Sequence, residues 1–112
     1  MKTFIDFFCG GGGFSLGLYQ QGFKPIRGID SWEPAIKTHN LNFGLNDTPK
    51  DVLDFQNLKE IEELEDSHII IGSPPCVSFS LSNKSGGADK SLGIQLIETF
   101  LKVVAIKKHK KK

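Results

Sequence analysis

A run of four glycines, Gly10 to Gly13, follows an apolar segment directly and constrains the fold more than any other feature of the chain. The preceding residues 3–8 are almost continuously apolar, with Asp6 as the exception, which is typical of a strand buried on both faces of a parallel sheet. Glycines permit a tight turn that a backbone with side chains cannot easily follow. A short helix over residues 14–21, stopped by Gly22, is expected next.

The same alternation continues along the chain and predicts one small α/β domain in its 112 residues. Ser31 is the expected N-cap of a second helix, and a polar, glycine-bearing stretch over 82–89 is expected to be a mobile loop. The pattern implies a parallel sheet with helices on both faces. Further strands are predicted over 24–29, 51–53 (brief) and 67–71, and helices over 31–41, 56–65 (amphipathic) and 92–106.

Composition excludes several classes of protein. The net charge is +1, but residues 107–112 contain five lysines, so the rest of the chain is slightly acidic. The overall charge therefore does not indicate a nucleic-acid-binding protein. We expect 1–106 to form the domain and 107–112 to be a frayed, solvated basic tail, with a weak phosphate contact as the alternative. Cys9 and Cys76 are the only cysteines, without CxxC or zinc-site spacing, so no metal is expected. No apolar run reaches about 18 residues and no signal peptide is evident, which predicts a cytoplasmic protein with reduced thiols and no membrane association.

The glycine run is expected to face a cofactor. A strand before it and a helix after it would aim backbone N–H groups and a helix N-terminus at a ligand. The spacing departs from GxGxxG at Ser15, and no Gly-Lys-Ser/Thr follows. Both absences favour a nucleoside cofactor without phosphates, such as S-adenosylmethionine. The alternative is a plain tight turn.

Three aspartates are candidates for the same site. Asp30 lies 20 residues after Gly10 at the end of the second predicted strand, where a carboxylate can hold a ribose; a helix-start carboxylate is the alternative. Asp51 could accept from an adenine amino group or could be a turn aspartate. Asp6 lies within a strand and needs hydrogen-bond partners, which the cofactor or the glycine-loop amides could supply.

Cys76 is the candidate nucleophile. The apolar run 68–71 stops at Gly72, and the two prolines that follow stiffen the loop that carries the cysteine. Such a loop lies at the carboxyl end of a strand, where ligands collect in open α/β sheets. The alternative is a small buried cysteine, which is how we interpret Cys9. No histidine is near Cys76 in sequence.

Taken together, these segments resemble the motifs of DNA cytosine-5 methyltransferases. Residues 4–18 resemble the family's first motif, and 72–80 its catalytic Pro-Cys motif. Between them, 28–32 with 42–43 resemble the ribose-binding segment, and 51–52 the adenine-contacting one. The resemblance covers about residues 3–106 and implies a partial Rossmann-like fold that uses S-adenosylmethionine.

The resemblance also implies a mechanism on double-stranded DNA. The target cytosine is flipped out, the thiolate of Cys76 adds to its C6, and C5 takes the methyl group before its proton leaves. The implied cofactor contacts are Phe8, Gly10, Gly12, Gly13, Asp30, Ser31, Trp32, Asp51 and Pro74. The implied DNA contacts are Pro75, Val77, Ser78 and Ser80.

Two departures from the family's pattern limit this reading. Val77 stands where the family usually has glutamine, and the later Glu-Asn-Val and Arg motifs and the target recognition domain have no counterpart in this chain. We therefore expect little activity from the chain alone and a second polypeptide that supplies the missing motifs. The alternatives are an inactive remnant that binds cofactor or partner without catalysis, and a nicotinamide-dependent oxidoreductase fragment.

Overall fold

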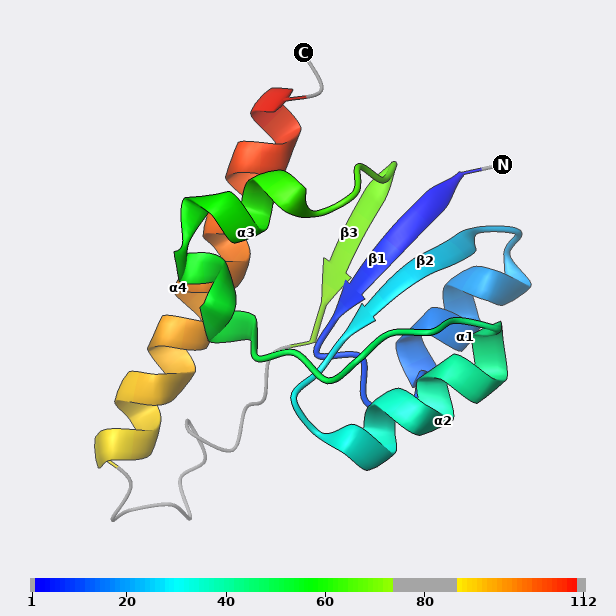
Figure 1. Ribbon diagram of the computed structural model, residues 1–112, viewed down its shortest axis with the longest axis horizontal. Helices are drawn as coiled ribbons and strands as arrows, with labels where there is room; N and C mark the ends of the chain where they lie inside the picture. The colour runs from blue at the N-terminus through cyan, green and yellow to red at the C-terminus, as the bar shows by residue number, and fades with distance from the viewer. Residues whose placement is uncertain (1, 74–86, 111–112) are drawn as a thin grey trace.

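Three parallel strands form the centre of the part of the chain that the computed structural model describes, residues 2–73 and 87–110 (Figure 1). The strands are β1 (Thr3–Phe7), β2 (Lys24–Ile29) and β3 (Ile69–Gly72), in the order β2-β1-β3. The central strand β1 pairs in parallel with both neighbours. The predicted parallel sheet is therefore confirmed.

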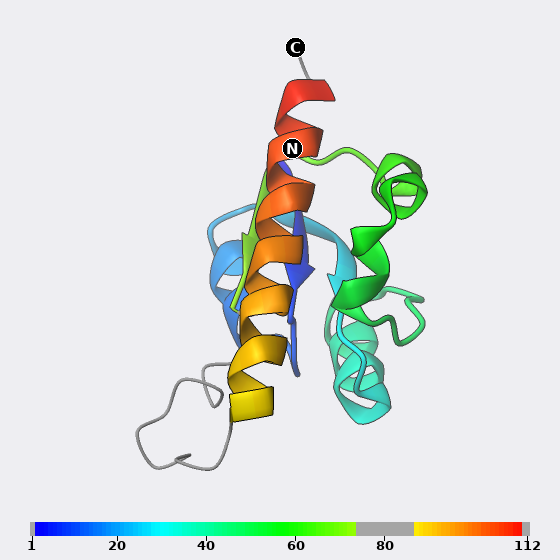
Figure 2. The same cartoon turned by 90° about the vertical axis from the view of Figure 1, so that its left-hand side faces the viewer.

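Helices cover both faces of this sheet. They are α1 (Gly13–Gln20), α2 (Glu33–Phe43), α3 (Leu58–Glu63) and α4 (Gly87–Lys110), with a short 3-10 helix η1 (Val52–Gln56). Side chains alternate along β1, so Asp6 faces α1 and α2, whereas Ile5 and Phe7 face η1, α3 and α4. Figure 2 shows α4 running along the sheet in the second of these layers.

The main hydrophobic core lies between the sheet and the layer formed by η1, α3 and α4. Phe7 is fully buried there, and its ring meets those of Phe55 and Phe100 edge-on at centroid distances of 5.3 and 5.5 Å. Burial of one such side chain contributes about 1.5–3 kcal/mol. Gly72 allows the close approach of α4, because a Cβ at that position would lie 2.6 Å from the Phe100 ring.

Several predicted boundaries were wrong. The brief strand over 51–53 is instead the start of η1, because the side chain of Asp51 accepts a hydrogen bond from the backbone N–H of Leu53 and caps a helical turn. The N-cap of α2 is Trp32 rather than Ser31. α3 is shorter than predicted, and α4 is longer at both ends, so residues 87–89 of the expected mobile loop are helical.

The C-terminal part of α4 is also less solvated than its lysines suggested. Lys107 is 3% exposed, and its Nζ donates to the backbone carbonyl of Leu64 and lies 2.8 Å from Oδ1 of Asp66. The buried ammonium group is tolerated because the carbonyl of Leu64 accepts its hydrogen bond and the carboxylate of Asp66 neutralises its charge. The prediction of a solvated tail was therefore wrong for Lys107.

Candidate functional site

A cavity of about 300 Å³ opens at the carboxyl ends of the three strands. Phe8 follows β1, Asp30 follows β2 and Ser73 follows β3, and all three line the cavity. The remaining lining residues are Ser31, Asp51, Val52 and Leu96. Four of the residues predicted to bind the cofactor, Phe8, Asp30, Ser31 and Asp51, are thus brought together from separate segments.

Phe8 holds a strained backbone conformation beside this cavity. Its φ is 59°, and it is the one non-glycine residue with positive φ in the described part of the chain. Its backbone N–H donates to the carbonyl of Ile29 at 2.8 Å, which ties the end of β1 to β2. A bulky residue in the left-handed region is uncommon, and such strain concentrates at functional sites.

Asp30 fixes the glycine loop to the end of β2. Its Oδ2 accepts from the backbone N–H of Gly10 at 3.0 Å, and its Oδ1 accepts from that of Trp32 at 2.9 Å. The carboxylate therefore also serves the start of α2, as the alternative interpretation held. Each carboxylate oxygen has further acceptor capacity, so these bonds leave room for ribose hydroxyls.

Asp51 has two roles in the structure. It caps η1 through Oδ1, as the turn-aspartate interpretation predicted, and it also lines the cavity. The predicted glycines are placed differently. Gly12 and Gly13 line a separate hollow of about 380 Å³ beside α1 and α2, and Trp32 is 67% exposed and lines neither hollow.

The predicted catalytic segment lies outside the described residues. This applies to Pro74, Pro75, Cys76, Val77, Ser78 and Ser80. Ser73, the last described residue before it, lines the cavity. Three cavity residues, Val52, Ser73 and Leu96, were not among the predicted site residues, although Val52 and Ser73 lie within the segments 51–52 and 72–80 that carry the resemblance. Val52 and Ser73 adjoin predicted site residues, whereas Leu96 fitted the pattern of a core helix.

A buried polar cluster that no sequence spacing revealed lies beneath the glycine loop. Asp6 is 1% exposed, and the Oγ of Ser15 donates to its Oδ2 at 2.6 Å and lies 2.9 Å from Nε2 of His39. The hydrogen-bond partner of Asp6 is thus a hydroxyl of α1, whereas the sequence had suggested the cofactor or a glycine-loop amide. Asp6 Oδ1 and His39 Nδ1 have no hydrogen-bond partner among the described residues.

Burial controls the protonation of this cluster. It raises the pKa of Asp6 to about 6 and lowers that of His39. It also raises the pKa of the neighbouring Cys9 thiol to about 12, so Cys9 stays a neutral packing residue, as predicted. Burial thus shifts the titration of each group toward its uncharged form, although Asp6 with a pKa of about 6 is still mostly ionised at pH 7.

Two absences can be stated for residues 2–73 and 87–110. These residues contain no cluster of three side chains suited to bind a metal ion. None of the helices described there has the length and apolarity that a bilayer crossing requires.

Comparison with known proteins places these features in a family. A family model described as C-5 cytosine-specific DNA methylase matches residues 2–111. The type II methyltransferase M.HgiDI of Herpetosiphon aurantiacus is 41% identical over 108 residues, which cover 93% of this chain and 33% of the relative. M.HgiGI of the same organism is 38% identical over 105 residues, covering 93% of this chain and 80% of the relative. The chain thus spans about a third of the first of these relatives.

A solved structure gives the same picture. It belongs to an E. coli protein encoded within a prophage and described as a DNA modification methyltransferase. The two chains are 30% identical with a TM-score of 0.64, over 86% of this chain and 27% of the other.

Proposed function

The chain belongs to the C-5 cytosine-specific DNA methylase family, and from this premise we propose that it contributes the cofactor half of an enzyme that methylates C5 of cytosine in double-stranded DNA. The cofactor we propose is S-adenosylmethionine. Because the chain spans 33% of M.HgiDI, the activity of the whole enzyme is part of this proposal. We expect the protein to act in the cytoplasm, where its DNA substrate is accessible.

The single observation that carries the proposal is the cavity at the strand ends. In the strand order β2-β1-β3, the connection from β1 leads to β2 on one side of β1, and the chain later crosses to β3 on the other side. The direction of the connections therefore reverses between β1 and β3, and the carboxyl ends of these two strands form a topological switch point. Ligands in open α/β sheets bind in the crevice at such points. About 300 Å³ is at the lower end of the range for small-molecule pockets, which suits part of a nucleoside cofactor.

The residues that line the cavity suit such a ligand. Asp30 would accept hydrogen bonds from ribose hydroxyls. Asp51 would accept a hydrogen bond from the adenine amino group, because capping η1 leaves other acceptor positions of its carboxylate free. Phe8 would pack against the cofactor with its ring, and Ser31 would add a hydroxyl. The backbone amides that hold Asp30 already fix its orientation, so less ordering is required on binding.

Catalysis is assigned to Cys76. When bound, S-adenosylmethionine supplies an electrophilic methyl group. The thiolate of Cys76 adds to C6 of the flipped cytosine, and the electron density that this bond delivers makes C5 nucleophilic. After C5 is methylated, loss of its proton restores the C5–C6 double bond and expels the thiolate. We propose that Pro74 contributes to the cofactor site, and that Pro75, Val77, Ser78 and Ser80 contact the DNA.

We further propose that a second polypeptide completes the enzyme. The four residues of β3 are only half-buried, and no strand pairs with its outer edge among the residues described. An unpaired strand edge is a surface on which another strand can add. An alternative with the same support is a chain that binds cofactor or partner without catalysis.

Two measurements test these proposals. Calorimetric titration with S-adenosylhomocysteine should show binding that Asp30→Ala weakens at least about tenfold, or about 1.4 kcal/mol. Absence of binding to the wild-type chain would refute the cofactor assignment.

Transfer of labelled methyl groups to cytosine-containing DNA should be low for the chain alone. It should rise on addition of a polypeptide corresponding to the remainder of M.HgiDI, and Cys76→Ser should abolish it. Labelling that survives Cys76→Ser would rule out the covalent mechanism. Cofactor binding with no labelling under either condition would favour the non-catalytic alternative.

A further inference from the structure

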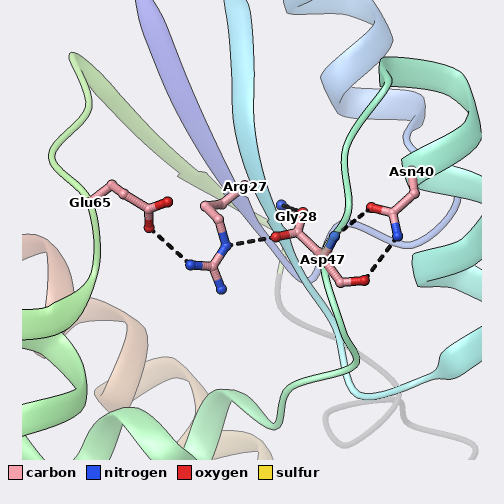
Figure 3. Close-up of polar contacts among 5 residues, drawn as sticks. All are labelled: Arg27, Gly28, Asn40, Asp47 and Glu65. Atoms are coloured by element: carbon pink, nitrogen blue, oxygen red, sulfur yellow. Dashed lines mark hydrogen bonds and ion pairs between the residues drawn. The ribbon is translucent and has the colours of Figure 1, made fainter.

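The outer edge of β2 is covered by a loop that one carboxylate holds in place. The backbone N–H of Gly28 points out of this edge and donates to Oδ2 of Asp47 at 2.8 Å (Figure 3). Asp47 Oδ1 lies 2.7 Å from Nε of Arg27, and the two side chains form an ion pair. The Nε–H of Arg27 is not aligned with this oxygen for a hydrogen bond. Arg27 in turn pairs through Nη1 with Oε1 of Glu65 at 2.9 Å. The carboxylate of Asp47 thus occupies the place that the backbone of a neighbouring strand would take.

The side chain of Asp47 is 6% exposed, so its charge requires these partners. A buried carboxylate without hydrogen bonds or a counter-charge is costly, and loss of one partner leaves the other buried and unpaired. Arg27 is about a quarter exposed and Glu65 about half exposed, so the outer pair is weaker because water screens it. Asp47 is therefore the centre of the network and Glu65 its periphery.

The backbone of Asp47 is held as firmly as its side chain. Asn40 of α2 donates from Nδ2 to the carbonyl of Asp47 at 2.9 Å, and the N–H of Asp47 donates to Oδ1 of Asn40 at 3.1 Å. Figure 3 shows this two-way contact on the side of Asp47 opposite to Arg27. The loop is thereby attached to β2 and to α2 at the same residue.

This attachment leads directly to the cavity. Three residues after Asp47, the backbone N–H of Lys50 donates to the carbonyl of Asp30 at 2.9 Å. The next residue, Asp51, lines the same cavity as Asp30. The position of Asp51 relative to Asp30 therefore depends on where Asp47 holds the preceding part of the loop.

We propose that Asp47 is a positioning residue for the cofactor site. It holds the segment from Lys50 to Asp51 against the end of β2, so that the carboxylates of Asp30 and Asp51 face one ligand. The identity of that ligand depends on the function proposed above, but the positioning itself does not. Asp47 does not line the cavity, so its effect on binding is transmitted through the backbone of Lys50.

The test compares Asp47→Ala with Asp47→Asn and with Glu65→Gln. The alanine variant removes every side-chain contact of Asp47. The asparagine variant keeps an oxygen acceptor for the N–H of Gly28. The Glu65 variant removes the peripheral ion pair alone and is the matched control. Two quantities are measured: amide hydrogen exchange residue by residue, and the Kd for S-adenosylhomocysteine.

A positioning role predicts a selective effect. In Asp47→Ala, exchange of the Lys50 amide should accelerate at least about tenfold and the Kd should rise about tenfold, while exchange within β1 is unchanged. Asp47→Asn should restore the Kd to within about threefold of wild type, and Glu65→Gln should match wild type. If Asp47→Ala does not fold, Asn40→Ala, which releases the backbone of Asp47, is expected to accelerate the same amide.

Other outcomes would overturn the proposal. Exchange that accelerates equally in β1 and at Lys50 would show a purely structural role, and an unchanged Lys50 amide in the variants would show none. If the wild-type chain binds no S-adenosylhomocysteine, the proposed function fails, yet the exchange of Lys50 still decides whether Asp47 positions the segment.

Discussion

The buried carboxyl group of Asp6 predicts how the stability of the protein changes with pH. Burial raises its pKa from the ordinary 3.8 to about 6, against the hydrogen bond from Ser15, which lowers it, and with a smaller contribution from the charge of Asp30. In the unfolded chain the group has its ordinary pKa. Between pH 4 and pH 6 the folded protein therefore keeps a proton that the unfolded chain has lost, so folding weakens as the pH rises through this window.

The size of this effect follows from the two pKa values. The difference between 3.8 and about 6 corresponds to about 3 kcal/mol, at about 1.4 kcal/mol per pH unit. Asp6 is 1% exposed, so little of this is lost to screening by solvent. Asparagine carries no charge at any pH. At pH 4 the unfolded carboxyl is already more than half ionised, so part of this difference is already present before the window begins. Relative to wild type, Asp6→Asn should therefore gain about 2.4 kcal/mol of unfolding free energy between pH 4 and pH 7.5.

Taking the difference between variant and wild type removes two complications. Any constant cost of fitting asparagine is the same at every pH. Burial also lowers the pKa of His39, which weakens folding as the pH falls below 6.5, but His39 is present in both proteins. What remains is the titration of Asp6 itself.

Urea unfolding followed by circular dichroism across this pH range measures the difference. Ser15→Ala serves as a second variant, because it removes the hydrogen bond that lowers the pKa of Asp6 and should steepen the decline. A carboxyl ¹³C titration of the wild type gives the folded pKa directly. Parallel pH curves for Asp6→Asn and wild type, or a ¹³C midpoint near 4, would refute the reasoning.

Three further substitutions test the packing of the fold. Gly72→Ala should destabilise the fold by about 1–3 kcal/mol in urea unfolding, because its Cβ would meet the ring of Phe100 at 2.6 Å; an unchanged stability would contradict this contact. Gly12→Ala should cost about 1–3 kcal/mol in the same assay, since its φ of 107° is strained for alanine. Lys107→Met should lower the melting temperature through a loss of about 1–3 kcal/mol, because the carbonyl of Leu64 loses its donor, whereas Lys108→Met, at an exposed position, should not.

The sequence predicted those parts of the fold that local patterns determine. Apolar runs that lead to glycine identified β1 and β3, because a parallel strand covered on both faces has few polar positions. β2 contains Lys24 and Arg27, and it was predicted as the next strand in the same alternation. Placing Asp30 at the end of β2 then followed from counting residues along a strand and a helix. Its proximity to Gly10 was predicted because the carboxyl ends of parallel strands meet at one edge.

The features that the sequence did not reveal depend on contacts between distant segments. The side chain of Asp51 initiates a helical turn in place of the expected strand, a local competition that apolar patterning does not detect. The contact of Ser15 with His39 joins two helices, and that of Asp47 with Gly28 joins a loop to a strand edge. Neither pair has a characteristic spacing, since the distance in sequence depends only on the lengths of the intervening elements.

The two kinds of polar group in this structure differ in a way that bears on function. Asp30 and Asp51 line the open cavity with partly used carboxylates, so they can accept additional donors from a ligand at small cost in ordering. Asp6 is enclosed with Ser15 beneath the glycine loop, and burial raises its pKa to about 6. Under the proposed function, the strand ends would recognise the ligand and the buried cluster would support the loop. Because the described cavity walls come from β1, β2, η1, the end of β3 and α4, cofactor affinity should be measurable in this chain independently of methyl transfer.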